Sequence, residues 1–169
     1  LVDIGYPQEP ALVTELVAVY RAHRPNIALA TDVASGLAQL RSHAHLALIT
    51  DGFSVCQRNK IEALGLETWL NPIIVTDELG SGFRKPHPKA FEHIEQHFAR
   101  VATRFAYVGD NPQKDFTAPR AKSWTTFRIR REGGLHCKVE CRNGVVDFEI
   151  ALISDLNSWL FSSTSLCGN

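Results

Sequence analysis

Methionine is absent from all 169 residues, and no apolar run approaches the roughly 18 residues that a membrane-spanning helix needs. Neither sign of charge is in excess, because 18 basic and 18 acidic side chains give a formal net charge of zero. A balanced charge does not predict a general polyanion binder. We therefore expect neither a membrane span nor a nucleic-acid partner. Since a natural reading frame begins with methionine, we expect the chain that starts at Leu1 to be a fragment.

Cysteine is present, but its spacing predicts no disulfide framework and no zinc site. We expect free thiols, as in a protein of the reducing cytoplasm. The length of 169 residues and a hydrophobic content of 44% predict one globular core. The four cysteines concerned are Cys56, Cys137, Cys141 and Cys167.

Helical and strand patterns alternate along the chain. Apolar residues at helical spacing predict helices over 10–23, 33–43, 54–64 and 88–98, with a closing helix over 154–161. Short, nearly continuous apolar runs predict strands over 45–50, 73–75, 105–108, 125–129 and 145–150. This alternation predicts an α/β protein with a parallel sheet. Outside the chemistry, Asp32 is expected to be a helix N-cap, and Arg128, Arg130 and Arg131 are expected on a solvated surface.

Polar groups gather in three short segments near predicted strand ends. Because the carboxyl ends of parallel strands meet at one edge of a sheet, we expect these groups to lie close together there. Such an edge is where α/β proteins bind their ligands. The segments are Thr50-Asp51-Gly52, Lys85-Pro86, and Gly109-Asp110 with Asp115.

Each segment suits a different part of a phosphoryl-transfer site. The Thr50 hydroxyl and the next backbone N–H can hold a phosphoryl oxygen, although Thr76-Asp77 repeats the pattern and makes it a weak signal alone. The Lys85 ammonium, restrained by Pro86, can neutralise charge on a phosphoryl group, or it is an ordinary loop lysine. Together these two segments favour an anion site over either one alone.

The third segment carries two carboxylates. Asp110 follows a buried strand and a glycine, and a carboxylate there suits Mg²⁺, which takes one or two protein carboxylates and keeps several waters. Asp115 can orient a metal-bound water or bond to Lys85, and the simpler alternative is that it caps the next helix.

Taken in this order, the three segments resemble motifs two, three and four of the haloacid dehalogenase (HAD) superfamily of hydrolases. The resemblance covers about residues 12–160. The flanking residues are similar to the phosphatase and haloacid-dehalogenase-like branch of that family. These flanks are Gln57-Arg58-Asn59-Lys60, Lys85-Pro86-His87-Pro88 and Asp115-Phe116-Thr117-Ala118-Pro119.

The resemblance implies a Rossmannoid parallel sheet with helices on both faces. It also implies Mg²⁺-dependent phosphatase chemistry on a small phosphorylated metabolite, through an aspartyl-phosphate intermediate. The roles that it implies are catalysis by Thr50, Lys85 and Asp115, substrate binding by Thr50, Asp51, Gly52 and Lys85, and Mg²⁺ binding by Asp110 and Asp115.

The family's first motif, an apolar strand ending in Asp-x-Asp that supplies the nucleophile, is not found. The N-terminal candidate is Leu1-Val2-Asp3-Ile4-Gly5, where Gly5 stands in place of the second acid, and Asp3 is interpreted as a loop or cap residue. In the family that strand is central, between the strands at 46–50 and 105–108. Its place would then be filled by residues upstream, by the 145–150 strand, or by a partner chain, for example in a homodimer.

The domain interpretation follows from this departure. Residues 1–30 are assigned to the end of a helical cap and its return linker, 31–161 to the core, and 162–169 to a frayed tail. Two other functions stay open: an inactive or regulatory protein that keeps the phosphate pocket, and a hydrolytic 2-haloacid dehalogenase that needs no metal. The acidic pair Asp110 and Asp115 favours the metal-using phosphatase.

Overall fold

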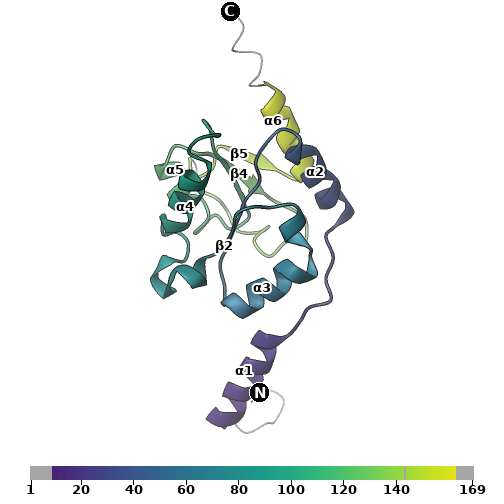
Figure 1. Ribbon diagram of the computed structural model, residues 1–169, viewed down its shortest axis with the longest axis vertical. Helices are drawn as coiled ribbons and strands as arrows, with labels where there is room; N and C mark the ends of the chain where they lie inside the picture. The colour runs from purple at the N-terminus through teal and green to yellow at the C-terminus, as the bar shows by residue number, and fades with distance from the viewer. Residues whose placement is uncertain (1–8, 143, 163–169) are drawn as a thin grey trace, which may run out of the picture.

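The computed structural model describes residues 9–142 and 144–162 (Figure 1). Its α-helices are α1 (Pro10–Ala22), α2 (Thr31–Arg41), α3 (Ser54–Ala63), α4 (Lys89–Phe98), α5 (Thr117–Ala121) and α6 (Leu156–Ser162). Its strands are β1 (Leu48–Thr50), β2 (Ile73–Val75), β3 (Ala106–Gly109), β4 (Thr125–Ile129) and β5 (Phe148–Ile150). Short 3₁₀ turns are η2 (Leu66–Thr68), η3 (Thr76–Leu79), η4 (Ser81–Phe83) and η5 (Ile153–Asp155). The predicted alternation of helices and strands is confirmed.

All strand pairs are parallel, but the pairing divides the described strands into two groups. One group is β1-β2, in which Leu48 lies opposite Ile73. The other is β3-β4-β5, in which Ala106 lies opposite Thr125 and Phe127 lies opposite Phe148. Parallel strands joined by helical crossovers are the arrangement that the sequence predicted.

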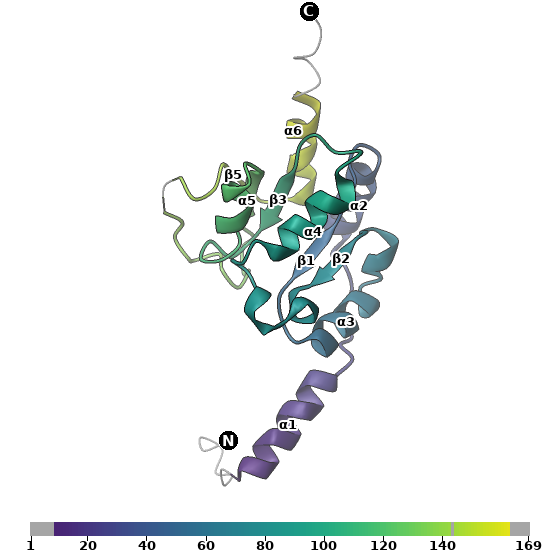
Figure 2. The ribbon, with the colours of Figure 1, turned by 60° about the vertical axis from the view of Figure 1, so that its left-hand side comes forward.

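The two groups face each other across a break between β1 and β3 (Figure 2). A cavity of about 490 Å³ lies there, lined by residues of both strands and of α2, α4 and α6. In the described part of the chain, β1 and β3 do not pair with each other, and a slot separates their edges. The suggestion that 145–150 fills the slot is wrong, because β5 pairs with β4 at the far edge.

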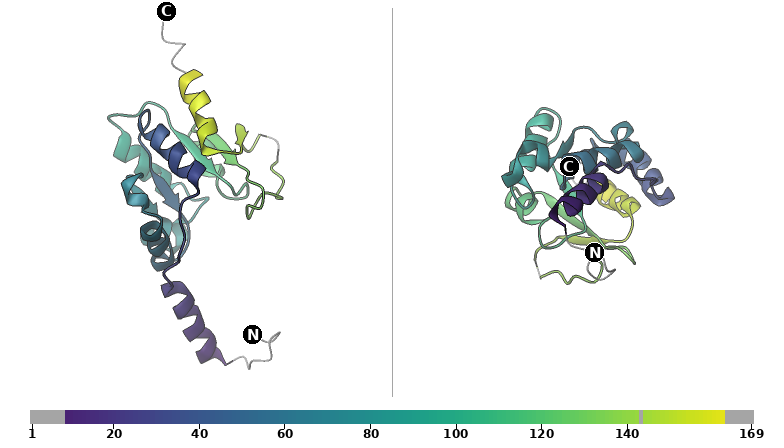
Figure 3. Two further views of the ribbon diagram at one scale, coloured as in Figure 1. Left: turned by 90° about the vertical axis from the view of Figure 1, so that its right-hand side faces the viewer. Right: turned by 90° about the horizontal axis from the view of Figure 1, so that it is seen from below.

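Helices cover both faces of the sheet, as expected. On one face, α4 buries Phe91, Ile94 and Phe98 against Ile49 of β1 and Trp124. The predicted apolar face of this helix is therefore confirmed, and Pro88 occupies its N-cap position. On the other face, α2 and α6 pack side by side, with Leu40 and Leu156 against Phe127 of β4 (Figure 3). These two cores hold the strand ends that carry the polar segments.

Two predictions outside the site were wrong, for electrostatic reasons. Asp32 lies in the first turn of α2, where Ala30 is the N-cap, and its carboxylate pairs with Arg131. Arg128 is 1% exposed, because its guanidinium donates to the carbonyls of His136 (2.9 Å) and Val139 (2.6 Å). Buried charge of this kind needs such bonds, and they fix the loop after β4.

Helix α1 projects from the rest of the molecule (Figures 1 and 3). It has no buried residue, and its apolar side chains Leu16 and Val17 are 44% and 37% exposed. Its C-terminal end is held on α3, because the Asn59 amide donates to the carbonyls of Ala22 (3.1 Å) and His23 (3.0 Å). Such bonds satisfy carbonyls that a helix end leaves free.

No helix in residues 9–142 and 144–162 is long and apolar enough to cross a membrane. Cys56, Cys137 and Cys141 are free thiols, as predicted. Asp3, Cys167 and the predicted tail beyond residue 162 lie outside the part of the chain that the structure describes.

Candidate active site

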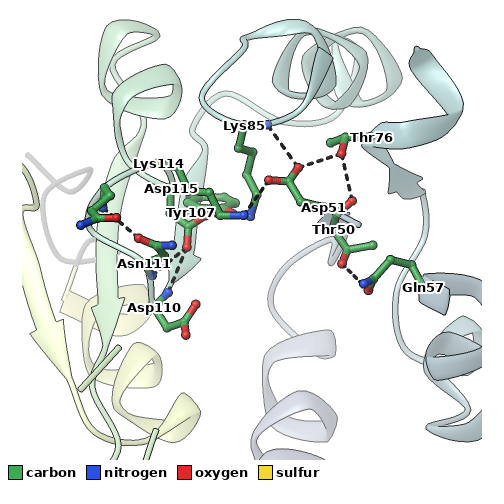
Figure 4. Close-up of polar contacts among 11 residues, drawn as sticks. Thr50, Asp51, Gln57, Thr76, Lys85, Tyr107, Asp110, Asn111, Lys114 and Asp115 are labelled. Carbon is green, nitrogen blue, oxygen red and sulfur yellow. Dashed lines mark hydrogen bonds and ion pairs between the residues drawn. The ribbon is translucent and has the colours of Figure 1, made fainter. Parts of the chain in front are cut away.

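The three polar segments meet at the carboxyl ends of the strands (Figure 4). Thr50 ends β1 and Asp51 follows it, Lys85 comes from the loop after β2, and Asp110 and Asp115 follow β3. The contacts among them cross the break between the two strand groups. The expectation that the segments share one edge of the sheet is therefore confirmed by the geometry.

Lys85 carries a more buried positive charge than Lys114, the other lysine at this edge. Its Nζ lies 2.7 Å from Asp115 Oδ1 and donates to the Tyr107 hydroxyl at 3.0 Å. The Lys85 and Asp115 side chains are only 9% and 3% exposed. Burial would lower the pKa of Lys85, but Tyr107 and Asp115 outweigh it and raise that pKa. The ammonium therefore stays charged, with one of its three N–H groups free for a further acceptor.

Tyr107 supports this lysine from within the sheet. Burial raises the pKa of its phenol to about 12, so the hydroxyl stays neutral and accepts from Lys85. Its ring packs edge-on against Phe91 of α4, with centroids 5.1 Å apart. The hydroxyl is thereby held by the apolar core rather than by a mobile loop.

The Asp51 carboxylate bonds to other groups of the protein. Oδ1 accepts from the Lys85 backbone N–H (3.1 Å) and the Thr76 hydroxyl (2.7 Å), while Oδ2 pairs with Lys114 Nζ at 2.9 Å. Burial would raise the pKa of Asp51, but bonds from Lys114, Thr76 and Lys85 outweigh it and lower that pKa. An ionised carboxylate at this point repels a phosphate, so only the Asp51 backbone suits the predicted substrate contact.

Gln57 of α3 contacts both Thr50 and Gly52. The Thr50 hydroxyl donates to Gln57 Oε1 at 2.9 Å. Gly52 has φ +139°, and a Cβ there would lie 2.4 Å from Gln57 Nε2. The positive φ therefore favours glycine here, and the Gln57 amide packs closely against it. This arrangement keeps the Thr50 hydroxyl oriented at the strand end.

The two predicted metal ligands differ in how well they fit Mg²⁺. Asp110 is exposed at the strand end, and its backbone N–H donates to Asp115 Oδ2 (3.2 Å). Asp115 Oδ2 also accepts from the Asn111 N–H (2.9 Å), and its Oδ1 faces Lys85. Both Asp115 oxygens are thus engaged, which favours its second predicted role, the contact with Lys85. Asp110 fits a hard cation, since Mg²⁺ takes few protein carboxylates.

Four contributing residues were missed from the sequence: Gln57, Thr76, Tyr107 and Lys114. Thr76 belongs to the very Thr-Asp pair that made the pattern seem unspecific, and its hydroxyl serves Asp51. Lys114 stands next to Asp115, but nothing in the sequence indicates that it reaches the end of β1. These contacts depend on tertiary placement and not on a local pattern.

Comparison with known proteins identifies the family. The sequence model of the haloacid dehalogenase-like hydrolases matches residues 5–121, which is well over half of the chain. This fold, with polar groups at the carboxyl edge of a parallel sheet, agrees with that match. The chain therefore belongs to the haloacid dehalogenase-like hydrolases.

Two sequence relatives are named as phosphatases. The chain is 33% identical over 153 residues to a glyceraldehyde 3-phosphate phosphatase of Methanopyrus kandleri, covering 87% of this chain and 63% of that protein. It is 32% identical over 112 residues to a phosphoserine phosphatase of Thermus thermophilus, covering 66% of this chain and 44% of that protein. The chain thus spans less than two thirds of either relative.

Solved structures share the fold. The HAD-hydrolase YfnB of Bacillus subtilis, solved with bound magnesium, matches with a TM-score of 0.70 and 17% identity, over 94% of this chain and 66% of that one. A 2-haloacid dehalogenase of Pseudomonas syringae matches with a TM-score of 0.70 and 22% identity, over 96% and 66% of the two chains. At these identities the likeness establishes the fold alone.

Gly109 gives a test of the Asp115 placement. A Cβ at Gly109 would lie 2.7 Å from Asp115 Oδ2 and 2.9 Å from Asp115 Cβ. We expect Gly109→Ala to displace Asp115 and lower the free energy of unfolding by about 1–3 kcal/mol, measured by urea denaturation. Gly82→Ala is the control, because its Cβ would meet nothing within 4 Å. Equal stability of Gly109→Ala and wild type would contradict the close approach of Asp115.

Proposed function

We propose that this edge of the sheet is the phosphate- and metal-binding part of a Mg²⁺-dependent phosphatase site for a small phosphorylated metabolite. The observation that carries the proposal is the buried Lys85 ammonium, held between Asp115 and Tyr107 with a donor left over. A positive charge that is held in place before the substrate binds, and is shielded from water, stabilises a phosphoryl group during its transfer. The names of the relatives from Methanopyrus kandleri and Thermus thermophilus support the phosphatase class.

Each residue has a proposed role in binding or charge stabilisation. Lys85 neutralises the phosphoryl oxygens, Thr50 offers its hydroxyl to one of them, and the backbone at Asp51 and Gly52 lines the same strand end. Asp110 would hold Mg²⁺, which supplies further positive charge to the phosphate when it is bound. Asp115 keeps Lys85 charged and oriented. The family resemblance implies a carboxylate nucleophile. Asp51 Oδ2 and Asp115 Oδ1 each face a lysine, so we assign this role to neither residue.

The remaining features of the proposal concern the whole protein. We assign α1 to the end of a cap over the site, supported by its exposed apolar side chains and its separation from the core. A cytoplasmic location is supported by the free thiols. A homodimer stays a prediction. The dehalogenase alternative is less favoured, because such chemistry leaves Asp110 without a role.

The role of Asp115 separates two electrostatic accounts. Asp115→Asn removes a negative charge, so net charge alone predicts tighter anion binding. If Asp115 positions Lys85, tungstate affinity instead falls by about tenfold, which is ~1.4 kcal/mol. Lys85→Ala should also weaken binding. We would measure tungstate binding by calorimetry at fixed Mg²⁺.

The control for this comparison is Glu95→Gln. Glu95 Oε2 pairs with Lys122 Nζ at 2.8 Å, and Lys122 shortly precedes β4, at the opposite edge of the sheet. This change also removes the charge of a lysine-paired carboxylate and should leave tungstate affinity as it is. Unchanged or tighter tungstate binding by Asp115→Asn would return Asp115 to the role of a helix cap.

Asp110 gives a direct test of the metal site. Because its carboxylate is exposed at the strand end, we expect Asp110→Asn to weaken Mn²⁺ binding by about tenfold or more, measured by electron paramagnetic resonance. The exposed Glu132→Gln is the control for loss of one negative charge. Equal Mn²⁺ affinity in wild type and Asp110→Asn would remove the proposed ligand role.

Turnover tests whether the 169 residues include a nucleophile. Because the nucleophile motif that the family resemblance implies is not found, we expect no measurable hydrolysis of p-nitrophenyl phosphate by the chain of 169 residues. The assay would follow release of p-nitrophenol with and without Mg²⁺. Robust Mg²⁺-dependent turnover that Asp3→Asn abolishes would instead identify Asp3, outside the described residues, as the nucleophile.

A further inference from the structure

The break between β1 and β3 separates the candidate site into two halves that no strand pairing connects in the described residues. Ladder hydrogen bonds fix the spacing of paired strands, but β1 and β3 share none in the described residues. Thr50 and Asp51 stand on one side of the break, and Asp110 and Asp115 on the other. The distance between the two halves of the site therefore depends on side chains and on helix packing.

One ion pair spans the break directly. Lys114 follows β3, Asp51 follows β1, and Lys114 Nζ lies 2.9 Å from Asp51 Oδ2 (Figure 4). The Asp51 side chain is 9% exposed and that of Lys114 is 38% exposed. A buried carboxylate needs its partners, so the more exposed lysine completes the set that Asp51 requires.

The same carboxylate also controls the lysine of the phosphate site. Asp51 Oδ1 accepts the backbone N–H of Lys85 at 3.1 Å, and the Lys85 ammonium returns across the break to Asp115 at 2.7 Å. Asp115 is the next residue after Lys114. These contacts close a ring that runs through Asp51, Lys85, Asp115 and Lys114, and loss of one contact loosens the others.

We propose that Lys114 is a positioning residue of the phosphate site: through Asp51 it holds the loop of Lys85 in place across the break between β1 and β3. The inference deepens the proposed function and rests on it for the identity of the ligand. It differs from a role in which Lys114 only adds positive charge. In that case the effect would not pass through Asp51 or reach the Lys85 backbone.

The experiment uses Lys114→Met, Asp51→Asn and the double variant in the full chain. We expect each single change to weaken tungstate binding by about fivefold to tenfold, and the double variant to be no weaker than the worse single one, because the residues act as a unit. Exchange of the Lys85 backbone N–H should become faster in both single variants by a similar factor. Lys114→Arg should keep most of the affinity.

Lys122→Met is the matched control, since Lys122 forms a 2.8 Å pair with Glu95 away from the site. It should change neither tungstate binding nor exchange at Lys85. Urea denaturation of every variant would identify any variant that fails to fold. In that case the test of the positioning role is the tungstate affinity of Lys114→Arg and its rate of hydrogen exchange at the Lys85 backbone N–H. An Arg variant with wild-type exchange and affinity supports the proposal, and one that loses both overturns it.

Two results would overturn the positioning role. If Asp51→Asn binds tungstate more tightly while Lys114→Met binds it less tightly, then only net charge matters. If exchange at Lys85 is unchanged in Lys114→Met, then Lys114 does not act through Asp51. A wild-type chain that binds no tungstate would contradict the proposed function instead, while faster exchange at Lys85 in the variants would still support the link from Lys114 to Lys85.

Discussion

The candidate site depends on keeping a lysine charged where little water reaches it. A buried ammonium is unfavourable unless carboxylates and hydrogen-bond acceptors surround it. Asp115 and Tyr107 provide this for the Lys85 side chain, and Asp51 holds its backbone. Gly109 is needed for the same reason, because only a residue without Cβ lets Asp115 approach β3 so closely. The residue types at three strand ends follow from this one electrostatic constraint.

Much of the fold was readable from the sequence because local pattern and tertiary structure agree. β4 was predicted with its observed bounds, and α4 showed its buried face as Phe91, Ile94 and Phe98. The strand at 145–150 was identified, but its place in the sheet was not. Hydrophobic periodicity and composition do not show which edge of a sheet a strand joins. Arg128 was assigned to the surface because a charged residue at a strand end is usually solvated, and its carbonyl acceptors come from a loop without regular pattern.

The sequence indicated the main residues of the candidate site, but it did not indicate the residues that hold them in place. Thr50, Lys85, Asp110 and Asp115 follow strands or loops in an order that indicates phosphoryl chemistry. Tyr107 carried no such signal, because an aromatic residue inside a strand is ordinarily part of the core. Gly109 was noted as the glycine before Asp110, and the structure gives the reason for it, the space taken by Asp115. Contacts of this kind are set by packing between distant segments.

Charge balance connects the anion and the metal under the proposed function. Lys85 and Lys114 are each paired with a carboxylate, so these four side chains carry no net charge together. A phosphate dianion that enters such a neutral ring gains from the aimed donors but meets no excess of positive charge. A cation at Asp110 would supply the missing charge, and the local effect of a divalent ion exceeds that of any side chain. Anion and metal binding at this edge are therefore expected to reinforce each other, and the ring of ion pairs keeps the donors in place until both are present.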